Sequence, residues 1–146
     1  MIRRKLKVSW AGDFHPAYTN RRFLEDAISA GCDYFCFSPD GASDRVLQLL
    51  RKDMKVADIE KTIKLFSKLD GAQVAYNFMR DLPWCNSEHV RGLMRLLPKM
   101  LYTLREKLSF VELTQMRIYP YTELYDLSVK EGLIKEDESI LYPKHY

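Results

Sequence analysis

The sequence predicts an α/β fold, a fragment of a partial (β/α) barrel of the TIM type, with about four parallel strands and helices on the outer side. Strand and helix patterns alternate along the 146 residues, and each strand–helix pair spans roughly 30 to 40 residues. No tight hairpin turn joins two strand patterns. An open doubly wound sheet fits the same alternation. An antiparallel sheet with one solvated side is a further alternative, which the intervening helices disfavour. At this length the chain is expected to form a single domain, residues 1–146.

Four segments have the pattern of strands, and each has an apolar and a polar side. They cover residues 5–11, 33–38, 73–79 and 110–119. Parallel strands packed on both sides read as continuous apolar runs, so the polar side here is expected to face a barrel lumen or a ligand. The side expected to pack on helices carries Leu6, Val8, Trp10, Phe35, Phe37, Val74, Tyr76, Phe78, Val111 and Leu113. The polar side carries Lys5, Lys7, Ser9, Cys36, Ser38, Asp40, Asn77, Met79, Glu112, Thr114 and Met116.

Helical periodicity fills the intervals between these strands. The helices are expected from residue 19 or 20 to 30, from 43 to about 52, and over 56–69, 88–104 and 122–131. Asn20 or Thr19 can cap the first helix and Ser43 the second. Pro98 is expected to kink the fourth helix or split it in two. The tail after residue 132 has no clear period.

Composition excludes several classes of protein. The net charge is +3, with basic and acidic residues intermixed, so no nucleic-acid partner is expected. No apolar run approaches the ~20 residues that a membrane helix needs. The basic start of the chain is followed by an alternating segment rather than an apolar run, so no targeting segment is expected. A cytoplasmic location with reduced cysteines is the default expectation.

Motifs for the common catalytic chemistries are absent from the sequence. It contains no Walker-type loop, no G-x-G-x-x-G and no G-x-S-x-G. The three cysteines, Cys32, Cys36 and Cys85, form no C-x-x-C pair, so no metal site is expected. The histidines are isolated in the sequence, and His15 is the best placed for a catalytic role. Asp13 and Asp40 follow strands, where a carboxylate either binds a ligand or caps a helix.

Five segments, in the same order and spacing, resemble radical S-adenosylmethionine (SAM) enzymes. Residues 37–47 (FSPDGASDRVL) resemble the family segment ESGSDRVL, and residues 52–63 (KDMKVADIEKTI) resemble the run that follows it. Residues 76–83 (YNFMRDLP) resemble the fifth strand with its GLPGET end. Residues 117–125 (RIYPYTELY) are similar to PYPGTELY, and residues 130–134 (KEGLI) to its sequel. Within that family, the residues of these segments most resemble those of the iron–sulfur oxidoreductases that often carry a cobalamin-binding domain.

The resemblance covers nearly the whole chain and implies the carboxyl-terminal part of a partial barrel of six βα units. The full enzyme would use SAM and a four-iron cluster. The C-x-x-x-C-x-x-C loop that binds the cluster belongs to the first family strand, and Cys32-x-x-x-Cys36 does not continue it because Pro39 follows. Neither cofactor is therefore expected bound to this chain. Tyr121 stands where the family has glycine before Thr122.

Family residues of the fourth to sixth strands contact SAM and the substrate. Carried over by position, the resemblance implies SAM- or substrate-binding roles for Ser38, Asp40, Ser43, Asn77 and Met79. Asp40 stands where glutamate is usual and Ser43 matches the family serine. Asp40, Ser43 and Asn77 are expected to line one cavity at the carboxyl ends of the strands. No residue is expected to be catalytic.

Two functions remain open. The chain is either a fragment of a radical SAM oxidoreductase, inactive alone, or a degenerate non-catalytic barrel module that acts in binding or assembly. The expected partner is the missing amino-terminal barrel half or a second copy of the chain, and neither a membrane nor a nucleic acid. A half-barrel has open edges, of which residues 5–11 form one, so a homodimer is expected. The alternative is that the chain folds its own tail over the open side.

Overall fold

The computed structural model describes residues 7–83, 87–136, 138–139 and 143–146. Its centre is a four-stranded sheet of strands β1 (Trp10–Phe14), β2 (Cys32–Asp40), β3 (Gln73–Asp81) and β4 (Leu108–Gln115). The strands lie in the order β1-β2-β3-β4, and every neighbouring pair is parallel. The prediction of an α/β fold with four parallel strands is therefore confirmed, and the antiparallel alternative is wrong for this sheet.

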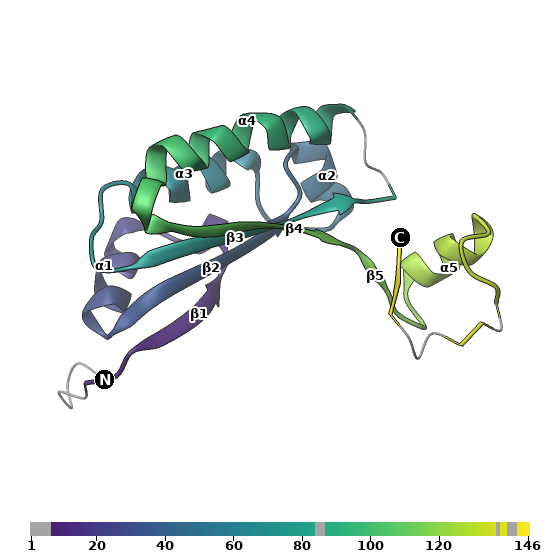
Figure 1. Cartoon of the computed structure of the whole chain (residues 1–146), viewed down its shortest axis with the longest axis horizontal. Coiled ribbons are helices and arrows are strands. Elements are labelled where there is room, and N and C mark those ends of the chain that lie inside the picture. The colour runs from purple at the N-terminus through teal and green to yellow at the C-terminus, as the bar shows by residue number, and fades with distance from the viewer. Residues whose placement is uncertain (1–6, 84–86, 137, 140–142) are drawn as a thin grey trace.

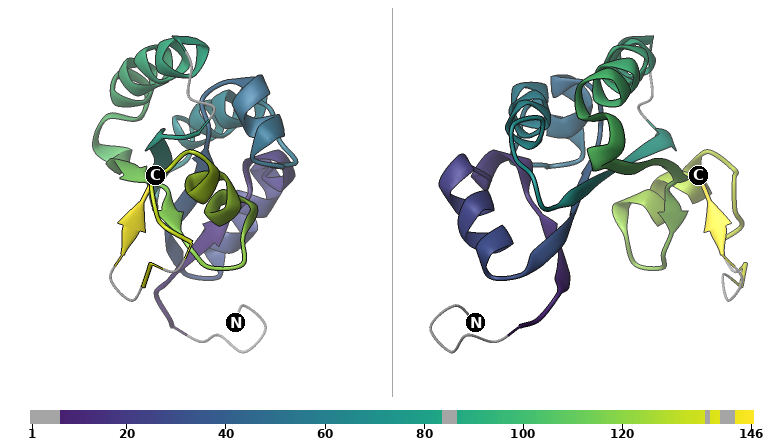
Figure 2. Two further views of the ribbon diagram at one scale, coloured as in Figure 1. Left: turned by 90° about the vertical axis from the view of Figure 1, so that its right-hand side faces the viewer. Right: turned by 60° about the vertical axis from the view of Figure 1, so that its left-hand side comes forward.

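Four helices connect and cover these strands. They are α1 (Arg21–Ser29), α2 (Asp44–Leu49), α3 (Val56–Phe66) and α4 (Ser87–Leu104). Short 3-10 turns, Pro16–Tyr18 and Arg105–Lys107, precede α1 and follow α4. Figures 1 and 2 show the helices on one side of the sheet, while the other side, called here the open face, carries no helix among the described residues. No helix in the described part of the chain is long and apolar enough to cross a membrane.

The core lies between the sheet and the helices. Phe35 and Phe37 of β2 contact Phe66 of α3, with ring centroids 5.1 and 5.9 Å apart, and Phe37 stacks on Tyr76 of β3 at 5.4 Å. The apolar side predicted for β2 and β3 is thus buried. Leu113 of β4 differs, because 41% of it is exposed. It lies near the end of the outermost strand, where no described helix covers it.

The first strand begins later than predicted. The expected strand covered residues 5–11, of which Lys5 and Leu6 lie outside the described residues, and residues 7–9 are not in a strand. The observed strand continues through Gly12 because Phe14 packs against Phe35, with ring centroids 4.7 Å apart. Tertiary packing thereby overrides the local preference of glycine for a turn.

Helix α4 runs without interruption across Pro98, so it is not split. A proline at this position removes the hydrogen bond to the carbonyl of Met94, one turn earlier. Both residues are exposed on the side of the helix away from the core. Water can satisfy the released carbonyl there, which keeps the helix continuous.

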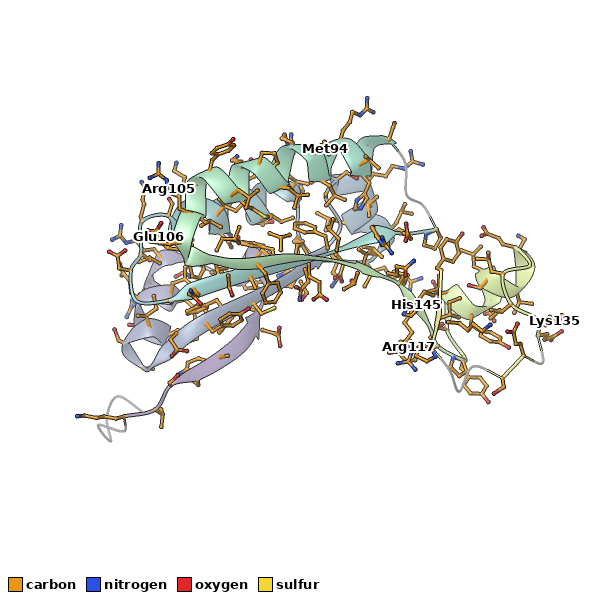
Figure 3. All side chains as sticks on the ribbon, viewed as in Figure 1. Met94, Arg105, Glu106, Arg117, Lys135 and His145 are labelled. Carbon is orange, nitrogen blue, oxygen red and sulfur yellow. The ribbon has the colours of Figure 1, made fainter. Side chains whose placement is uncertain are left out.

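The residues after β4 form a small separate unit. The fourth strand was expected to reach residue 118 or 119 but ends at Gln115. Strand β5 (Arg117–Ile118) instead pairs antiparallel with β6 (Lys144–His145), and α5 (Glu123–Lys130) lies between them in the chain. Figures 1 and 3 show this C-terminal unit beyond the carboxyl ends of the strands. An exposed ion pair, Arg51–Glu123 at 2.7 Å, links it to the rest of the protein.

Candidate functional site

A polar cluster lies in the middle of the open face. It consists of Cys36 and Ser38 on β2 and Asn77 on β3, which alternate with the buried aromatic residues of the same strands. The Asn77 side-chain amide donates to the Cys36 sulfur at 3.4 Å and to the Ser38 hydroxyl at 3.2 Å. The Asn77 Oδ1 atom is buried and has no hydrogen-bond partner among the described residues. An unsatisfied acceptor of this kind can receive a hydrogen bond from a ligand hydroxyl or ammonium group.

The electrostatics of this cluster keep its thiol protonated. Burial raises the pKa of Cys36, and a hydrogen bond to the Asp13 carboxylate and its negative charge raise this pKa further. Hydrogen bonds from Ser38 and Asn77 act in the opposite direction but are smaller effects. A thiolate is the reactive form of cysteine, so Cys36 is not set up as a nucleophile. The open face offers hydrogen-bonding groups rather than covalent chemistry.

Asp40 turns away from this cluster. A register shift between Phe37 and Asp40 places Asp40 opposite the buried Phe78, although strict alternation had predicted it on the polar side. Its carboxylate pairs with Lys52 Nζ at 2.5 Å, and the same ammonium group donates to the Ser38 carbonyl at 3.2 Å. Asp40 also has a φ of 63°, in the left-handed region. The extra residue of the bulge is the reason that the face prediction is wrong for Asp40.

Ser43 caps α2, as predicted, and faces the helix layer. Its hydroxyl accepts the Val46 N–H at 3.3 Å. It lines a pocket of about 400 Å³ between the starts of α2 and α3 and the first turns of α4. Arg91 and Arg95 supply part of the wall. Neither Asp40 nor Asn77 lines this pocket, so the structure does not bring together the three residues expected around one cavity.

His89 joins three segments of this region and was not singled out by the sequence. It is buried, its Nδ1 accepts the Ala42 N–H at 3.2 Å, and its Nε2 donates to the Met79 carbonyl at 2.9 Å. These bonds connect the turn after β2, the end of β3 and the start of α4. The Met79 side chain itself is partly buried on the open face, where Met79 is paired with Thr114 of β4. Through these two hydrogen bonds, His89 holds the turn that carries Ser43 against the end of β3.

Gly92 lies one turn after His89 and makes this approach possible. A Cβ atom at this position would lie 1.9 Å from the Ala42 carbonyl oxygen. The pattern His89-x-x-Gly92 on the buried side of an amphipathic helix is the signal that could have identified the contact. Glycine on the buried face lets the helix approach a neighbouring backbone closely, and the histidine three residues earlier can bond to the polar groups of that backbone.

The described residues contain no group of three or more His, Cys, Asp or Glu side chains that could hold a metal ion. Cys32 is buried and Cys36 is partly buried, both as free thiols, and Cys85 lies outside the described residues. His15 packs beside Tyr18, with ring centroids 4.8 Å apart. The part of the chain that the structure describes therefore has no site that fits a four-iron cluster.

Comparison with known proteins adds no relative to this description. No protein-family model matches the chain, and no curated protein matches it in sequence. The α/β fold and the placement of the site residues follow from the chain's own structure.

Proposed function

We propose that this chain is the carboxyl-terminal part of a radical SAM barrel. It supplies part of the lumen wall that faces SAM and substrate, does not supply the cluster, and is inactive alone. The resemblance of five ordered segments to that family supports the proposal. In the complete enzyme, the cluster-bearing part would cleave SAM reductively, and this chain would bind and orient the reactants.

The observation that carries the proposal is the strand order combined with the one-sided helix layer. In a doubly wound sheet the order reverses and helices cover both faces. In a barrel, successive right-handed crossovers place each strand beside the last one and all helices outside. The order β1-β2-β3-β4, with helices on one side, is of the second kind. Its open face then corresponds to a lumen.

The chemistry of the open face fits a small polar ligand. The buried Asn77 Oδ1, which has no hydrogen-bond partner in the described part of the chain, can accept a hydrogen bond from the ammonium or ribose hydroxyl groups of SAM. Ser38 lies 3.2 Å from the same side chain. These two residues are the pair that we assign to binding. Met79, on the same face, adds an apolar surface nearby, and Asp40 and Ser43 shape the turn beside them.

A second function, a binding or assembly module without catalysis, is favoured by Tyr121. Tyr121 has a φ of 62°, in the left-handed region that suits the glycine of the family motif, and it is fully exposed. A non-glycine residue in this conformation costs about 1–2 kcal/mol. A backbone that keeps the shape of the motif while losing its glycine fits a chain that no longer binds the original ligand.

Anaerobic reconstitution with iron and sulfide, followed by calorimetric titration with SAM, tests the proposal. We expect no bound cluster and, because only part of the barrel is present, SAM binding so weak that no SAM stays bound through purification, with a Kd on the order of 1 mM. Asn77→Ala is expected to weaken this binding at least about fivefold, and Lys64→Ala, on the exposed side of α3, to leave it unchanged.

Two results would contradict it. One is a chain that takes up about four irons and loses them on Cys32→Ala with Cys36→Ala, because the cluster would then belong to this chain. The other is no SAM binding at 10 mM, which leaves the non-catalytic module.

A further inference from the structure

The outer edge of β4 is an open edge of the sheet. Among the described residues, β4 pairs with β3 on one side and with no strand on the other. Its eight residues contain no proline and no glycine, and Glu112 is the only charged one. Natural edge strands are usually protected by lysine, proline, bulges or short length, because unpaired N–H and C=O groups recruit other strands. The β4 edge has no lysine and no proline, and between its two register shifts with β3 it keeps a regular run from Phe110 to Thr114.

The opposite edge of the sheet is different. Strand β1 has only five residues, two of which are Gly12 and Asp13. Its pairing with β2 also contains a register shift between Trp10 and Ala11. Short length, glycine and charge disfavour pairing of β1 with a further strand, and the first two of these features distinguish it from β4. Of the two edges, β4 is therefore the one open to a partner, whereas the sequence pointed to the first strand.

Helix α4 carries an apolar stripe on the same side of the molecule. Val90, Met94, Leu97 and Leu101 follow the spacing of one helical face, and 69% of Met94 and 62% of Leu101 are exposed. Around a shallow hollow of about 580 Å³ lie Met94, Leu97, Pro98, Leu101 and Tyr102. Figure 3 shows Met94 on α4, above the sheet. Helix α3 lies on the other side of α4, where Lys99 pairs with Glu60 at 3.1 Å. The stripe therefore faces away from α3, toward the β4 side.

The charged side chains of α4 lie away from its apolar stripe. Arg91 and Arg95 line the Ser43 pocket, and Lys99 is paired with Glu60. Glu112 is the one charged residue of β4. A surface without a dominant charge gives no attraction to a strongly acidic or basic partner. It can meet a copy of itself when the two β4 strands pair in the register centred on Val111, which places Glu112 opposite Phe110 of the second copy rather than opposite the second Glu112.

The dimensions of the edge are large enough for a specific dimer. Eight strand residues span about 26 Å and the 18 residues of α4 about 27 Å, so the two elements match in length. With strand and helix layers of roughly 10 Å each, the projected area is on the order of 500 Å² per copy. The two copies together would bury on the order of 1,000 Å², which reaches the lower bound for a specific interface.

We propose that two copies of this chain associate about a two-fold axis through the β4–α4 edge, defined here as Leu108–Gln115 with Val90, Met94, Leu97 and Leu101. The two β4 strands pair antiparallel and extend the sheet across the dimer, and the two α4 stripes pack together. This arrangement leaves the open face and the β1 edge uncovered. It is therefore compatible with additional barrel strands at β1 and does not depend on the proposed function.

Light scattering after gel filtration of the full chain at about 100 µM tests the association. The expected mass is twice the 17.2 kDa of one chain. Amide hydrogen exchange at high and low protein concentration then locates the interface. Amides of Leu108–Gln115 are expected to exchange more slowly at high concentration, and those of Trp10–Phe14 at the same rate at both.

Leu101→Glu is the decisive variant, because it places a carboxylate in the stripe. We expect it to raise the dimer Kd at least about 100-fold without changing the circular dichroism spectrum. The matched control is Leu133→Glu, which charges a residue that is 52% exposed on the C-terminal unit and should remain dimeric. A 17.2 kDa monomer overturns the proposal. So does a dimer that survives Leu101→Glu, or one whose protected amides lie in β1 or on the open face.

Discussion

Consecutive residues of β2 and β3 belong to two different environments. Phe35, Phe37 and Tyr76 point into the helix-covered side and are completely buried. Cys36, Ser38 and Asn77 point to the open face, are partly exposed and bond to one another. Stability is therefore concentrated on one side of the sheet and ligand chemistry on the other. A substitution on the helix-covered side should therefore lower the free energy of unfolding, whereas a substitution of the next residue, on the open face, should mainly change ligand binding.

Phe37→Ala is expected to give the largest effect. It removes a ring that packs between Phe66 and Tyr76 and leaves a cavity in the core. The expected loss is about 3–5 kcal/mol in the free energy of unfolding, measured by urea titration. Ser38→Ala, one residue further along the same strand, serves as the control and should cost under about 1 kcal/mol. Equal losses at the two positions would refute the division between the faces.

Gly92→Ala tests the close contact between α4 and the turn that follows β2. The added Cβ would lie 1.9 Å from the Ala42 carbonyl oxygen, so α4 or the turn after β2 must move. We expect a loss of about 1–3 kcal/mol, read from the midpoint of thermal or urea unfolding. Thr103→Ala, at an exposed position of the same helix, should change it by less than about 0.5 kcal/mol. A stable Gly92→Ala protein would show that the two segments are not in fixed contact.

Tyr76 makes the buried side sensitive to alkaline pH. Burial raises its pKa well above the ordinary value of 10, and its hydroxyl lies 2.9 Å from that of Thr62. Below about pH 9 the phenol is protonated in both the folded and the unfolded chain, so this group gives no pH dependence. Above about pH 10 the unfolded chain releases the proton and the folded chain keeps it. Stability from this residue therefore falls by about 1.4 kcal/mol per pH unit.

Tyr76→Phe should remove that part of the alkaline slope. At pH 8 we expect the variant to be about 1 kcal/mol less stable to unfolding than the wild type, because the hydrogen bond between the Tyr76 and Thr62 hydroxyls is lost. By pH 11 this difference in unfolding free energy should be smaller, because the wild type has lost stability that the variant keeps. Urea midpoints at pH 8, 10 and 11 provide the measurement. The control is Tyr102→Phe, which changes an exposed tyrosine and should keep the full slope. Parallel curves for the wild type and Tyr76→Phe would argue against a neutral, buried phenol.

Asn77→Ala is expected to have the smallest effect on stability, under about 1 kcal/mol, although it removes two hydrogen bonds. Both bonds go to partly exposed partners on the open face, where water can replace them. Calorimetric unfolding checks this, alongside the SAM titration. If the unfolding temperature falls as far as in Phe37→Ala, the cluster supports the fold rather than a ligand.

Periodicity predicted most of the sheet because its signal is strong and local. Phe35, Phe37, Val74, Tyr76 and Phe78 alternate with polar residues, and all five are buried on the helix side. The ends of the elements depend on contacts that a local pattern does not contain. Strand β1 continues through Gly12 because of a contact with Phe35 of another strand. Strand β6 has two residues and forms only by pairing with β5.

The candidate site was predictable where alternation holds. Ser38 and Asn77 were expected on the polar side, and the structure brings them together. Asp40 was placed on the same side, but the bulge after Phe37 shifts the alternation by one residue. A single sequence gives no sign of such a bulge apart from Pro39. For His89 the sequence holds only the indirect signal of the His89-x-x-Gly92 pattern, because the partners of the histidine are backbone groups, Ala42 N–H and Met79 C=O.

The tie made by His89 also constrains the order of folding. The histidine lies 47 residues after Ala42, and the intervening chain includes α2, α3 and β3. Closing so long a loop is entropically costly until the intervening segments have packed. The turn that carries Ser43 therefore reaches its final geometry late, after β3 has joined the sheet. During synthesis, the two hydrogen bonds of His89 can form only after residue 89 has emerged from the ribosome, long after the last residue of β2, Asp40.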